Sequence, residues 1–212
     1  MNIITKIEVQ KRNKERVNIY IDEDYAFAIS AELVYKYDLK VKSKVDTETL
    51  KEVAEKEAIM KCRNSAIRVV ERSYKSEKEL YDKLKEKGYE DKAINLAIEF
   101  LKEYNFINDE TYTKSYIKDK IKTQGQKKIL YTLKRKGIDE ELIKDNLLAI
   151  DKEDEKEVAF TLAEKKYNIL IKRESDKYKI SQKLYRYLLS RGYEFSIAQE
   201  AIKKITNIEN EY

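Results

Sequence analysis

Positively charged side chains gather in one stretch of this 212-residue chain. Residues 114–136 hold nine basic residues against a single acidic one, Asp119, although the whole chain has 45 basic and 40 acidic residues. A local excess of this kind attracts a polyanion or an acidic protein surface, whereas the alternative interpretation is a solvated face without a partner. The candidate binding residues are Lys114, Lys118, Lys120, Lys122, Lys127, Lys128, Lys134, Arg135 and Lys136.

Catalytic and metal-binding patterns are missing from the sequence. The chain contains no histidine, which removes Ser-His-Asp and Cys-His arrangements and most zinc sites. Neither GxxxxGK[ST] nor GxGxxG occurs, and most carboxylates stand beside lysines, as expected of surface ion pairs. We therefore predict no catalytic residue, no metal ligand and no cofactor.

Composition indicates a folded cytoplasmic protein. Apolar residues make up 42% of the chain, which is enough for a core despite 40% charged residues and a net charge of +5. Cys62 is the single cysteine, so an intramolecular disulfide is excluded, and no apolar run has the length of a membrane span. High surface charge without a heptad seam favours a monomer.

Three of the four glycines end the same pattern. Each of Gly88, Gly137 and Gly192 follows a short amphipathic helix with a basic residue just before the glycine, and a second helical pattern comes after it. Counted back from the glycines, the apolar positions coincide, and the repeated core leucines are Leu84, Leu133 and Leu188. The period of about fifty residues predicts a tandem repeat of three-helix units.

The tyrosines of the repeat allow two interpretations. Tyr81 and Tyr185 stand seven residues before their repeat glycines and Tyr131 six before its own, each beside an apolar position of the helix. That regularity favours packing between helices with the hydroxyl group at the edge. Base stacking, for which aromatic rings between cations are suited, is the alternative.

The first part of the chain has the period of β-strands. Apolar residues alternate with period two over 7–29, with turns at 11–15 and 22–24, which predicts a small antiparallel meander. Ser30 is predicted to cap a short helix over 31–37. Such a small sheet needs other elements to pack on, and we expect it to cap the helical part.

Helical periodicity takes over from Asp46. We expect a long helix from there toward Tyr74, a capping box at Ser76 and Glu79, and caps at Asn108 or Asp109 and at Asp139. The first helix of the third unit is expected over about 156–171 and carries Val158, Leu162 and Tyr167. The predicted division is 1–45 (β-rich with a short helix), 46–106 (lead-in helix and first unit), 107–151 (second unit), 152–207 (third unit) and 208–212 (tail).

The middle of the chain resembles a known family. The run Asp109-Glu110-Thr111-Tyr112, followed by Tyr116, Lys120, Gly125, Ile129, Leu133 and Lys136-Gly137-Ile138, is similar to the central signature of RecX, the bacterial regulator of the RecA recombinase. Upstream, Arg72-Ser73, Ser76, Glu79-Leu80, Leu84 and Lys87-Gly88 resemble the preceding stretch of that family. Lys120 stands where members often carry arginine, so a bidentate contact at this position is lost.

The resemblance implies a function as well as a fold. RecX-like proteins are mainly α, with tandem three-helix units in an elongated, curved arrangement. They are not enzymes. They bind RecA in the groove or at the end of its filament on single-stranded DNA and inhibit ATP hydrolysis, filament growth and strand exchange, and some bind DNA directly.

Two other functions fit the residues. A direct DNA-binding module of helix-turn-helix type would also be built from three-helix units with a basic second helix. It would bind DNA without a protein partner, with strong dependence on salt. A helical scaffold that recognises an unrelated protein would bind neither DNA nor a recombinase.

Overall fold

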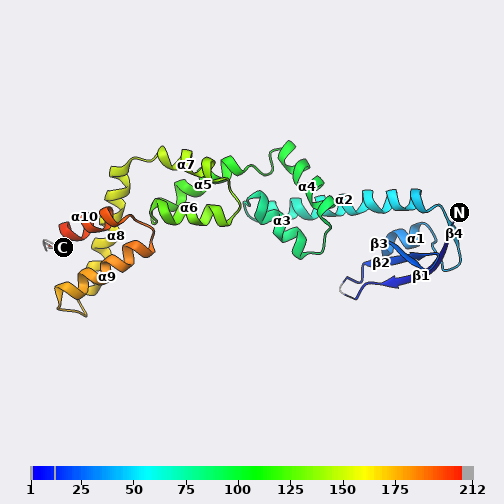
Figure 1. Ribbon diagram of the computed structural model, residues 1–212, viewed down its shortest axis with the longest axis horizontal. Coiled ribbons are helices and arrows are strands. Elements are labelled where there is room, and N and C mark those ends of the chain that lie inside the picture. The colour runs from blue at the N-terminus through cyan, green and yellow to red at the C-terminus, as the bar shows by residue number, and fades with distance from the viewer. Residues whose placement is uncertain (1, 12, 207–212) are drawn as a thin grey trace. The chain divides into compact units, whose positions relative to one another are not determined.

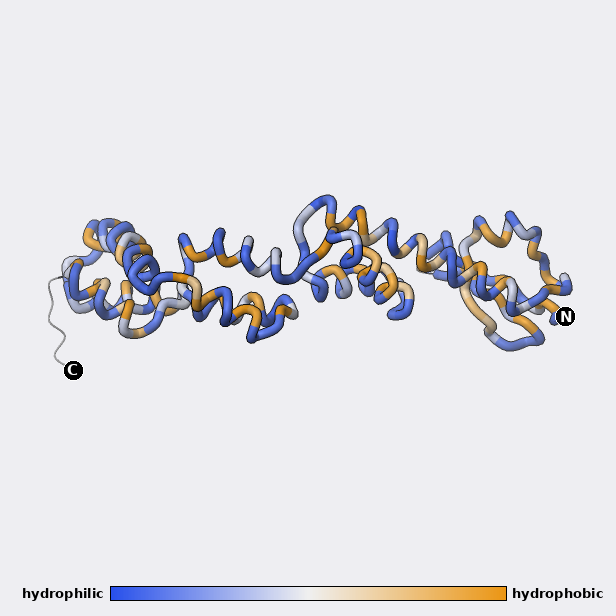
Figure 2. Tube along the Cα trace, turned by 90° about the horizontal axis from the view of Figure 1, so that it is seen from above, coloured by the Kyte–Doolittle hydropathy of each residue, from blue (hydrophilic) through white to orange (hydrophobic). Residues whose placement is uncertain are grey.

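The structure is a computed structural model that describes residues 2–11 and 13–206. The chain divides into two compact units, of which unit 1 comprises residues 1–73 and 80–106, and unit 2 comprises residues 74–79 and 107–212. The expected tail, 208–212, and Asn207 lie outside the described residues. Helices dominate the described chain, and apolar residues recur among polar ones along each helix (Figure 2).

Unit 1 begins with the expected antiparallel meander and one unpredicted strand. The strands are β1 (Asn2–Val9), β2 (Arg16–Ile21), β3 (Asp24–Ser30) and β4 (Lys44–Val45), in the sheet order β3-β2-β1-β4. Asp22 and Glu23 take φ values of 50° and 75° in the turn between β2 and β3, as a tight hairpin requires. The two-residue β4 was missed because it is too short to show an alternating pattern.

Two helices cover the sheet of unit 1 (Figure 1). They are α1 (Ala31–Lys36), capped by the Ser30 hydroxyl as predicted, and α2 (Thr47–Arg72), capped by the Asp46 carboxylate at the expected start of the long helix. Leu33 of α1 and Leu50 and Ala54 of α2 pack against the strand residues Ile4 and Ile19. The sheet therefore has a core of its own, closed by the first half of α2.

The second half of α2 belongs to the first three-helix group. Its other members are α3 (Glu77–Glu86) and α4 (Asp91–Glu103). Cys62 and Ala66 of α2 are fully buried, as are Leu80 and Leu84 of α3. Burial raises the pKa of the Cys62 thiol to about 11, so this cysteine stays a protonated core residue at neutral pH.

Unit 2 contains two further three-helix groups. The helices of the second group are α5 (Asp109–Lys120), α6 (Gln126–Arg135) and α7 (Glu140–Leu148). Those of the third group are α8 (Lys152–Leu170), α9 (Lys177–Ser190) and α10 (Phe195–Thr206). Each group has its own core, and the repeated leucines Leu133 and Leu188 are fully buried in it, as Leu84 is in unit 1.

The predicted start of α8 was wrong. The helix begins at Lys152 rather than near Lys156, because Asp151 caps it by accepting a hydrogen bond from the Glu153 N–H. Its buried line is Glu155, Ala159 and Ala163, whereas the larger residues Val158, Leu162 and Tyr167 are only partly buried beside it. Val158, Leu162 and Tyr167 pack against the core of the third group from that position.

All three repeated glycines close their helices in the predicted left-handed conformation. Gly88, Gly137 and Gly192 have φ values of 86°, 83° and 89°. In each case the N–H of the residue after the glycine donates to the carbonyl of the core leucine. The N–H of the glycine itself donates to the carbonyl of the residue after that leucine, and the two bonds together form the Schellman pattern. The sequence repeat is thus a repeat of one helix ending.

The space around these glycines differs. A Cβ atom at Gly88 would meet nothing within 4 Å. A Cβ at Gly137 would lie 2.5 Å from the Cβ of Lys78, and one at Gly192 would lie 2.3 Å from the Cβ and 2.5 Å from the backbone nitrogen of Lys128. Gly137 and Gly192 therefore serve two purposes, a positive φ and close approach of another helix, whereas Gly88 serves only the first.

This difference predicts unequal effects of alanine substitution. Gly88→Ala should cost about 1–2 kcal/mol of stability, the cost of a left-handed alanine. Gly192→Ala should cost about 2–5 kcal/mol, because overpacking against Lys128 adds to the backbone strain. Denaturant unfolding of the full chain, followed by circular dichroism, measures both losses, and equal losses would contradict the close contact at Gly192.

Candidate partner-binding surface

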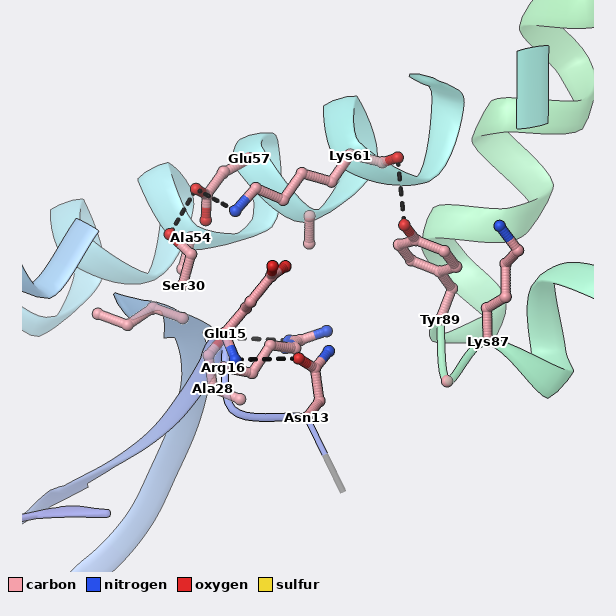
Figure 3. A pocket seen from close by; sticks show the side chains of 13 residues that line it. Asn13, Glu15, Arg16, Ala28, Ser30, Ala54, Glu57, Lys61, Lys87 and Tyr89 are labelled. Atoms are coloured by element: carbon pink, nitrogen blue, oxygen red, sulfur yellow. Dashed lines mark hydrogen bonds and ion pairs between the residues drawn. The ribbon is translucent and has the colours of Figure 1, made fainter. Parts of the chain in front are cut away.

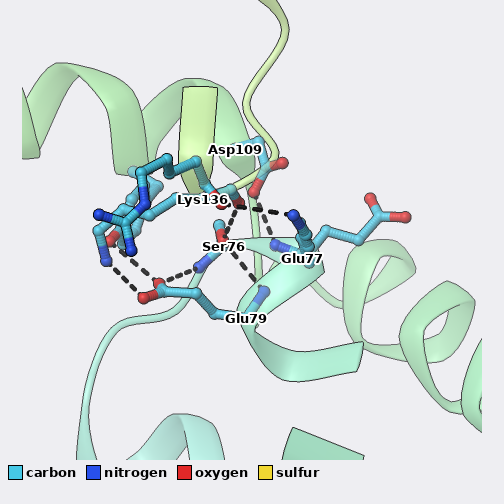
Figure 4. Close-up of polar contacts among 8 residues, drawn as sticks. Ser76, Glu77, Glu79, Asp109 and Lys136 are labelled. Atoms are coloured by element: carbon cyan, nitrogen blue, oxygen red, sulfur yellow. Dashed lines mark hydrogen bonds and ion pairs between the residues drawn. The ribbon is translucent and has the colours of Figure 1, made fainter. Parts of the chain in front are cut away.

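The first turn of α3 lies against the carboxyl end of α6. Ser76 closes the predicted capping box with Glu79, because its hydroxyl accepts from the Glu79 N–H at 3.2 Å while the Glu79 carboxylate accepts from the Ser76 N–H at 3.3 Å. The same hydroxyl donates to the carbonyl of Lys136 at 2.7 Å, and Lys136 forms an ion pair with Glu79 (Figure 4). Asp109 accepts from the Glu77 N–H at 2.9 Å.

The first turn of α6 meets the end of α9 in the same way. Gly125, like Ser76, stands twelve residues before its own repeat glycine. Its N–H donates to the carbonyl of Arg191 at 3.0 Å, and Lys128 donates to the carbonyl of Ser190 at 3.1 Å. Glu155 accepts from the N–H of Gln126 at 2.9 Å, the role that Asp109 has for Glu77.

The two carboxylates at these contacts have opposite pKa shifts. Burial of the Glu79 carboxyl opposes its ionisation, but hydrogen bonds from Lys136, the Ser76 N–H and Tyr112 outweigh this effect, so its pKa lies below the ordinary value. Glu155 is only 3% exposed, and burial raises its pKa although Gln126 donates to it. Glu79 is therefore a carboxylate held by a cation, whereas Glu155 sits in a site that favours its protonated form.

The nine candidate cations differ in their surroundings. Lys128 and Lys136 lie half-buried at the helix contacts, so we leave them out of the binding surface. Four others form surface ion pairs, each worth little: Lys114 with Glu110, Lys120 with Asp119, Lys127 with Glu194 and Lys134 with Glu140. Lys118, Lys122 and Arg135 are exposed, and the described residues give them no ion-pair partner.

These three exposed cations are not equivalent. Lys118 is on the outer side of α5, opposite the buried Tyr112 and the half-buried Tyr116. Arg135 lies at the end of α6, where its guanidinium group is 5.9 Å from the ring centre of Tyr131. Lys122 borders a hollow that Asp154 and Glu157 also line, which partly neutralises its charge. Lys118 and Arg135 are thus the cations best placed to attract a negatively charged partner.

The repeated tyrosines follow the packing interpretation only in part. The Tyr81 hydroxyl donates to Asp91 at 2.5 Å, and the Tyr185 hydroxyl donates to the carbonyl of Phe195 at 3.4 Å, which is the same position in the repeat. Tyr131 is 63% exposed, so the prediction that it packs between helices was wrong. Tyr131 stands one residue later in the repeat than Tyr81 and Tyr185, and Leu130 occupies their position.

A second group of cations lines a cavity in unit 1. Arg16, Lys61 and Lys87 surround it together with Glu15 and Glu57 (Figure 3). Lys61 pairs with Glu57 at 3.1 Å, Lys87 donates to the Ser65 hydroxyl at 3.0 Å, and Arg16 donates to the carbonyl of Ala28 at 3.3 Å. Because these groups contact one another and carboxylates share the wall, we do not assign a ligand to this cavity.

Sequence reasoning missed the residues that join the helices of unit 2. Glu79 was predicted only as part of a capping box, and Lys78, Asp109 and Glu155 were given no role at this contact. Asp109 and Glu155 precede buried residues of their helices by one turn, Thr113 and Ala159 respectively. An acidic residue four positions before a buried residue of the same helix was therefore the sequence signal for these helix contacts.

Comparison with protein families gives matches along most of the chain. Residues 2–46 match the regulatory protein RecX N-terminal domain, and residues 62–101, 108–147 and 153–202 match the first, second and third three-helix domains of RecX. The chain belongs to the RecX family. The three sequence repeats thus correspond to the family's three domains.

Individual relatives agree with this assignment. Regulatory protein RecX of Clostridium beijerinckii is 56% identical over 206 residues, which is 97% of each chain. That of Clostridium perfringens strain 13 is 55% identical over 212 residues, covering 100% of this chain and 99% of the relative.

Solved structures of the family have the same fold. A crystal structure of regulatory protein RecX has a TM-score of 0.66 at 27% identity, covering 96% of this chain and all of that one. RecX from Lactobacillus salivarius has a TM-score of 0.61 at 28% identity, covering 72% of this chain and 99% of that one. No helix among the described residues of this RecX-family chain has the length and apolar character to cross a membrane.

The lowered pKa of Glu79 predicts a stability difference that depends on pH. A carboxyl group with a lowered folded-state pKa stabilises the fold above its unfolded pKa and loses that contribution as pH falls through the folded pKa. We expect Glu79→Gln to be less stable than wild type at about pH 7, with the difference shrinking toward about pH 3. Urea unfolding across this range tests the expectation, and a difference independent of pH would argue against the ion pair with Lys136.

Glu155 should show the opposite dependence. Because its folded-state pKa is raised, its favourable contribution is present below the unfolded pKa and is lost as pH rises through the folded pKa. Glu155→Gln keeps an acceptor for Gln126 and cannot ionise, so its stability relative to wild type should increase between about pH 4 and about pH 7.5. Urea unfolding over the same pH series measures the stability of Glu155→Gln relative to wild type. If this relative stability decreases as pH rises, burial of the Glu155 charge is not unfavourable.

Proposed function

We propose that this chain is a regulator of the RecA recombinase that binds RecA and its filament on single-stranded DNA, in the groove or at the end. Binding inhibits ATP hydrolysis, filament growth and strand exchange. Membership of the RecX family is the observation that carries the proposal. The matched relatives are named regulatory proteins, and the resemblance of this chain to RecX implies RecA as the protein that it regulates. The chain acts as a monomer in the cytoplasm, without a cofactor and without catalysis of its own.

The charge of unit 2 supports a specific contact. Lys118 and Arg135 are exposed and unpaired among the described residues, so no internal ion pair has to be broken when a partner binds. Acidic groups on the filament surface or phosphates of its DNA would be attracted to them. The half-buried Lys136 and Lys128 hold the helices that carry these cations and need not touch the partner.

The same exposed cations support a second candidate function, direct binding to DNA. Lysine and arginine contacts to phosphates need no recombinase and weaken steeply with salt. A binding assay on the same DNA with the recombinase omitted separates the two functions. Inhibition of the recombinase, with or without binding to naked DNA, supports the filament regulator, whereas tight, salt-sensitive binding without inhibition supports the DNA-binding module.

Charge reversal on unit 2 tests the proposed contact. The double variant Lys118→Glu/Arg135→Glu should require about tenfold more protein to inhibit single-stranded-DNA-dependent ATP hydrolysis by RecA, because attraction is replaced by repulsion at two positions. Its melting temperature should stay close to that of wild type, since both side chains are exposed.

A matched control has the same change of charge in unit 1. Lys11→Glu/Lys14→Glu alters two exposed lysines in the turn between β1 and β2 and should inhibit as wild type does. If Lys118→Glu/Arg135→Glu inhibits as strongly as wild type, Lys118 and Arg135 do not contact the partner. If both double variants lose inhibition to the same extent, inhibition depends on the net charge of the protein alone.

A further inference from the structure

An open cavity lies beside the start of α9 and α10. Its volume is about 580 Å³, and its walls include Ser181, Gln182, Tyr185, Arg186, Phe195 and Gln199. All of these residues belong to the third three-helix group, so the cavity lies within unit 2. Its volume is in the range of pockets that hold small ligands.

The repeat explains why this surface is open. Counted from the repeat glycines, Ser181, Gln182 and Tyr185 of α9 correspond to Gln126, Lys127 and Leu130 of α6. In α6, the group that follows contacts this surface, because Glu155 accepts from the Gln126 N–H and Glu194 pairs with Lys127.

For α9 the described residues contain no fourth group to take that place. The Ser181 hydroxyl oxygen is buried at the cavity wall without a hydrogen-bond partner among the described residues.

The chemistry of the walls favours a nucleobase. The rings of Phe195 and Tyr185 meet edge to face with their centres 4.9 Å apart, and Phe195 is 60% exposed, so its ring surface is accessible for stacking. Gln182 and Gln199 each offer donors and an acceptor, as the polar edge of a base requires.

The charges at the cavity point to a negatively charged ligand. None of the described residues that line it is acidic, and Arg186 is exposed at its wall with a guanidinium group suited to phosphate. The neighbouring hollow at α6 differs, because Glu155 and Glu194 are among its lining residues.

We propose that this cavity binds an unstacked base of a single-stranded nucleic acid, with Arg186 on an adjacent phosphate. The base stacks on Phe195, and its polar edge meets Gln182 and Gln199. Bases within a duplex are stacked and paired and do not enter. The site uses none of the cations of the proposed filament contact, so it goes beyond the proposed function and is tested without a recombinase.

Photocrosslinking of the full chain locates the base. A single-stranded oligothymidylate with one 5-iodouracil is irradiated with the protein, with the recombinase omitted, and crosslinked peptides are mapped. We expect crosslinks at Tyr185 or Phe195, and competition by unlabelled single strand but not by duplex of the same length. Crosslinks confined to peptides outside α9 and α10, or no crosslinking at any protein concentration tested, would overturn the proposal.

Substitution of the stacking ring gives a second measurement. Phe195→Ala should weaken binding of the oligothymidylate by about 5- to 150-fold, the range for losing one stacked base. Tyr35→Ala removes a 90% exposed ring from α1 and should leave the affinity unchanged. Circular dichroism checks that both variants are folded, which is expected because both rings are exposed.

The Phe195→Ala variant also distinguishes whether the cavity binds a nucleobase or a segment of a protein. If Phe195→Ala binds single-stranded DNA as wild type does but inhibits the recombinase less, the cavity holds a segment of a protein, and the proposal is wrong. If DNA binding falls while inhibition of the recombinase persists, the cavity is a nucleic-acid site independent of the filament contact. Failure of the charge-reversal experiment on Lys118 and Arg135 would leave this result unaffected.

Discussion

The folding of unit 2 depends on one kind of contact, in which the first turn of one core helix is placed against the glycine-closed end of the next. The last carbonyls of an α-helix and its first N–H groups have no partners within the helix and carry opposite partial charges. In unit 2 some of these groups find partners on a neighbouring helix. The Ser76 hydroxyl donates to the carbonyl of Lys136 and the Gly125 N–H to that of Arg191, while Asp109 and Glu155 accept from the N–H groups of Glu77 and Gln126. The left-handed glycines make this possible, since a side chain at Gly137 or Gly192 would occupy the space of the incoming helix.

This contact also determines which charges remain for a partner. Two of the candidate cations are used inside the fold: Lys136 holds Glu79, and Lys128 donates to the end of α9. Others pair with carboxylates on the surface, and Lys118 and Arg135 stay exposed on α5 and α6. The last core helix, α9, ends in the same glycine-closed turn but has no described group against its start, and there the surface carries aromatic and amide side chains and Arg186. The repeat thus accounts both for the internal contacts and for the surface left uncovered.

Much of the fold could be predicted because its signals are local. A glycine after a basic residue, a serine three residues before a glutamate, and apolar residues at helical spacing each report on a single turn of chain, and the structure confirms them at Gly88, at Ser76 and at the buried leucines. The helix contacts could not be predicted in this way, because they join residues about sixty positions apart, such as Ser76 and Lys136. For the same reason Lys136 and Lys128 were grouped with the solvent-exposed cations. Tyr131 was misassigned because it stands one residue later in the repeat than Tyr81 and Tyr185, which turns it toward solvent, while Leu130 occupies their position.

The central claim is that the helix-end contact makes the second and third three-helix groups a single cooperative body. Native-state amide hydrogen exchange of the full chain under increasing denaturant tests it directly, with the buried amides around Leu133 in α6 and Leu188 in α9 as reporters. If the contact couples the groups, both sets of amides exchange through one opening with the same free energy and the same denaturant dependence. If the amides of α9 exchange through an opening of clearly lower free energy while those of α6 stay protected, the groups unfold independently, and the contact does not have the role assigned to it.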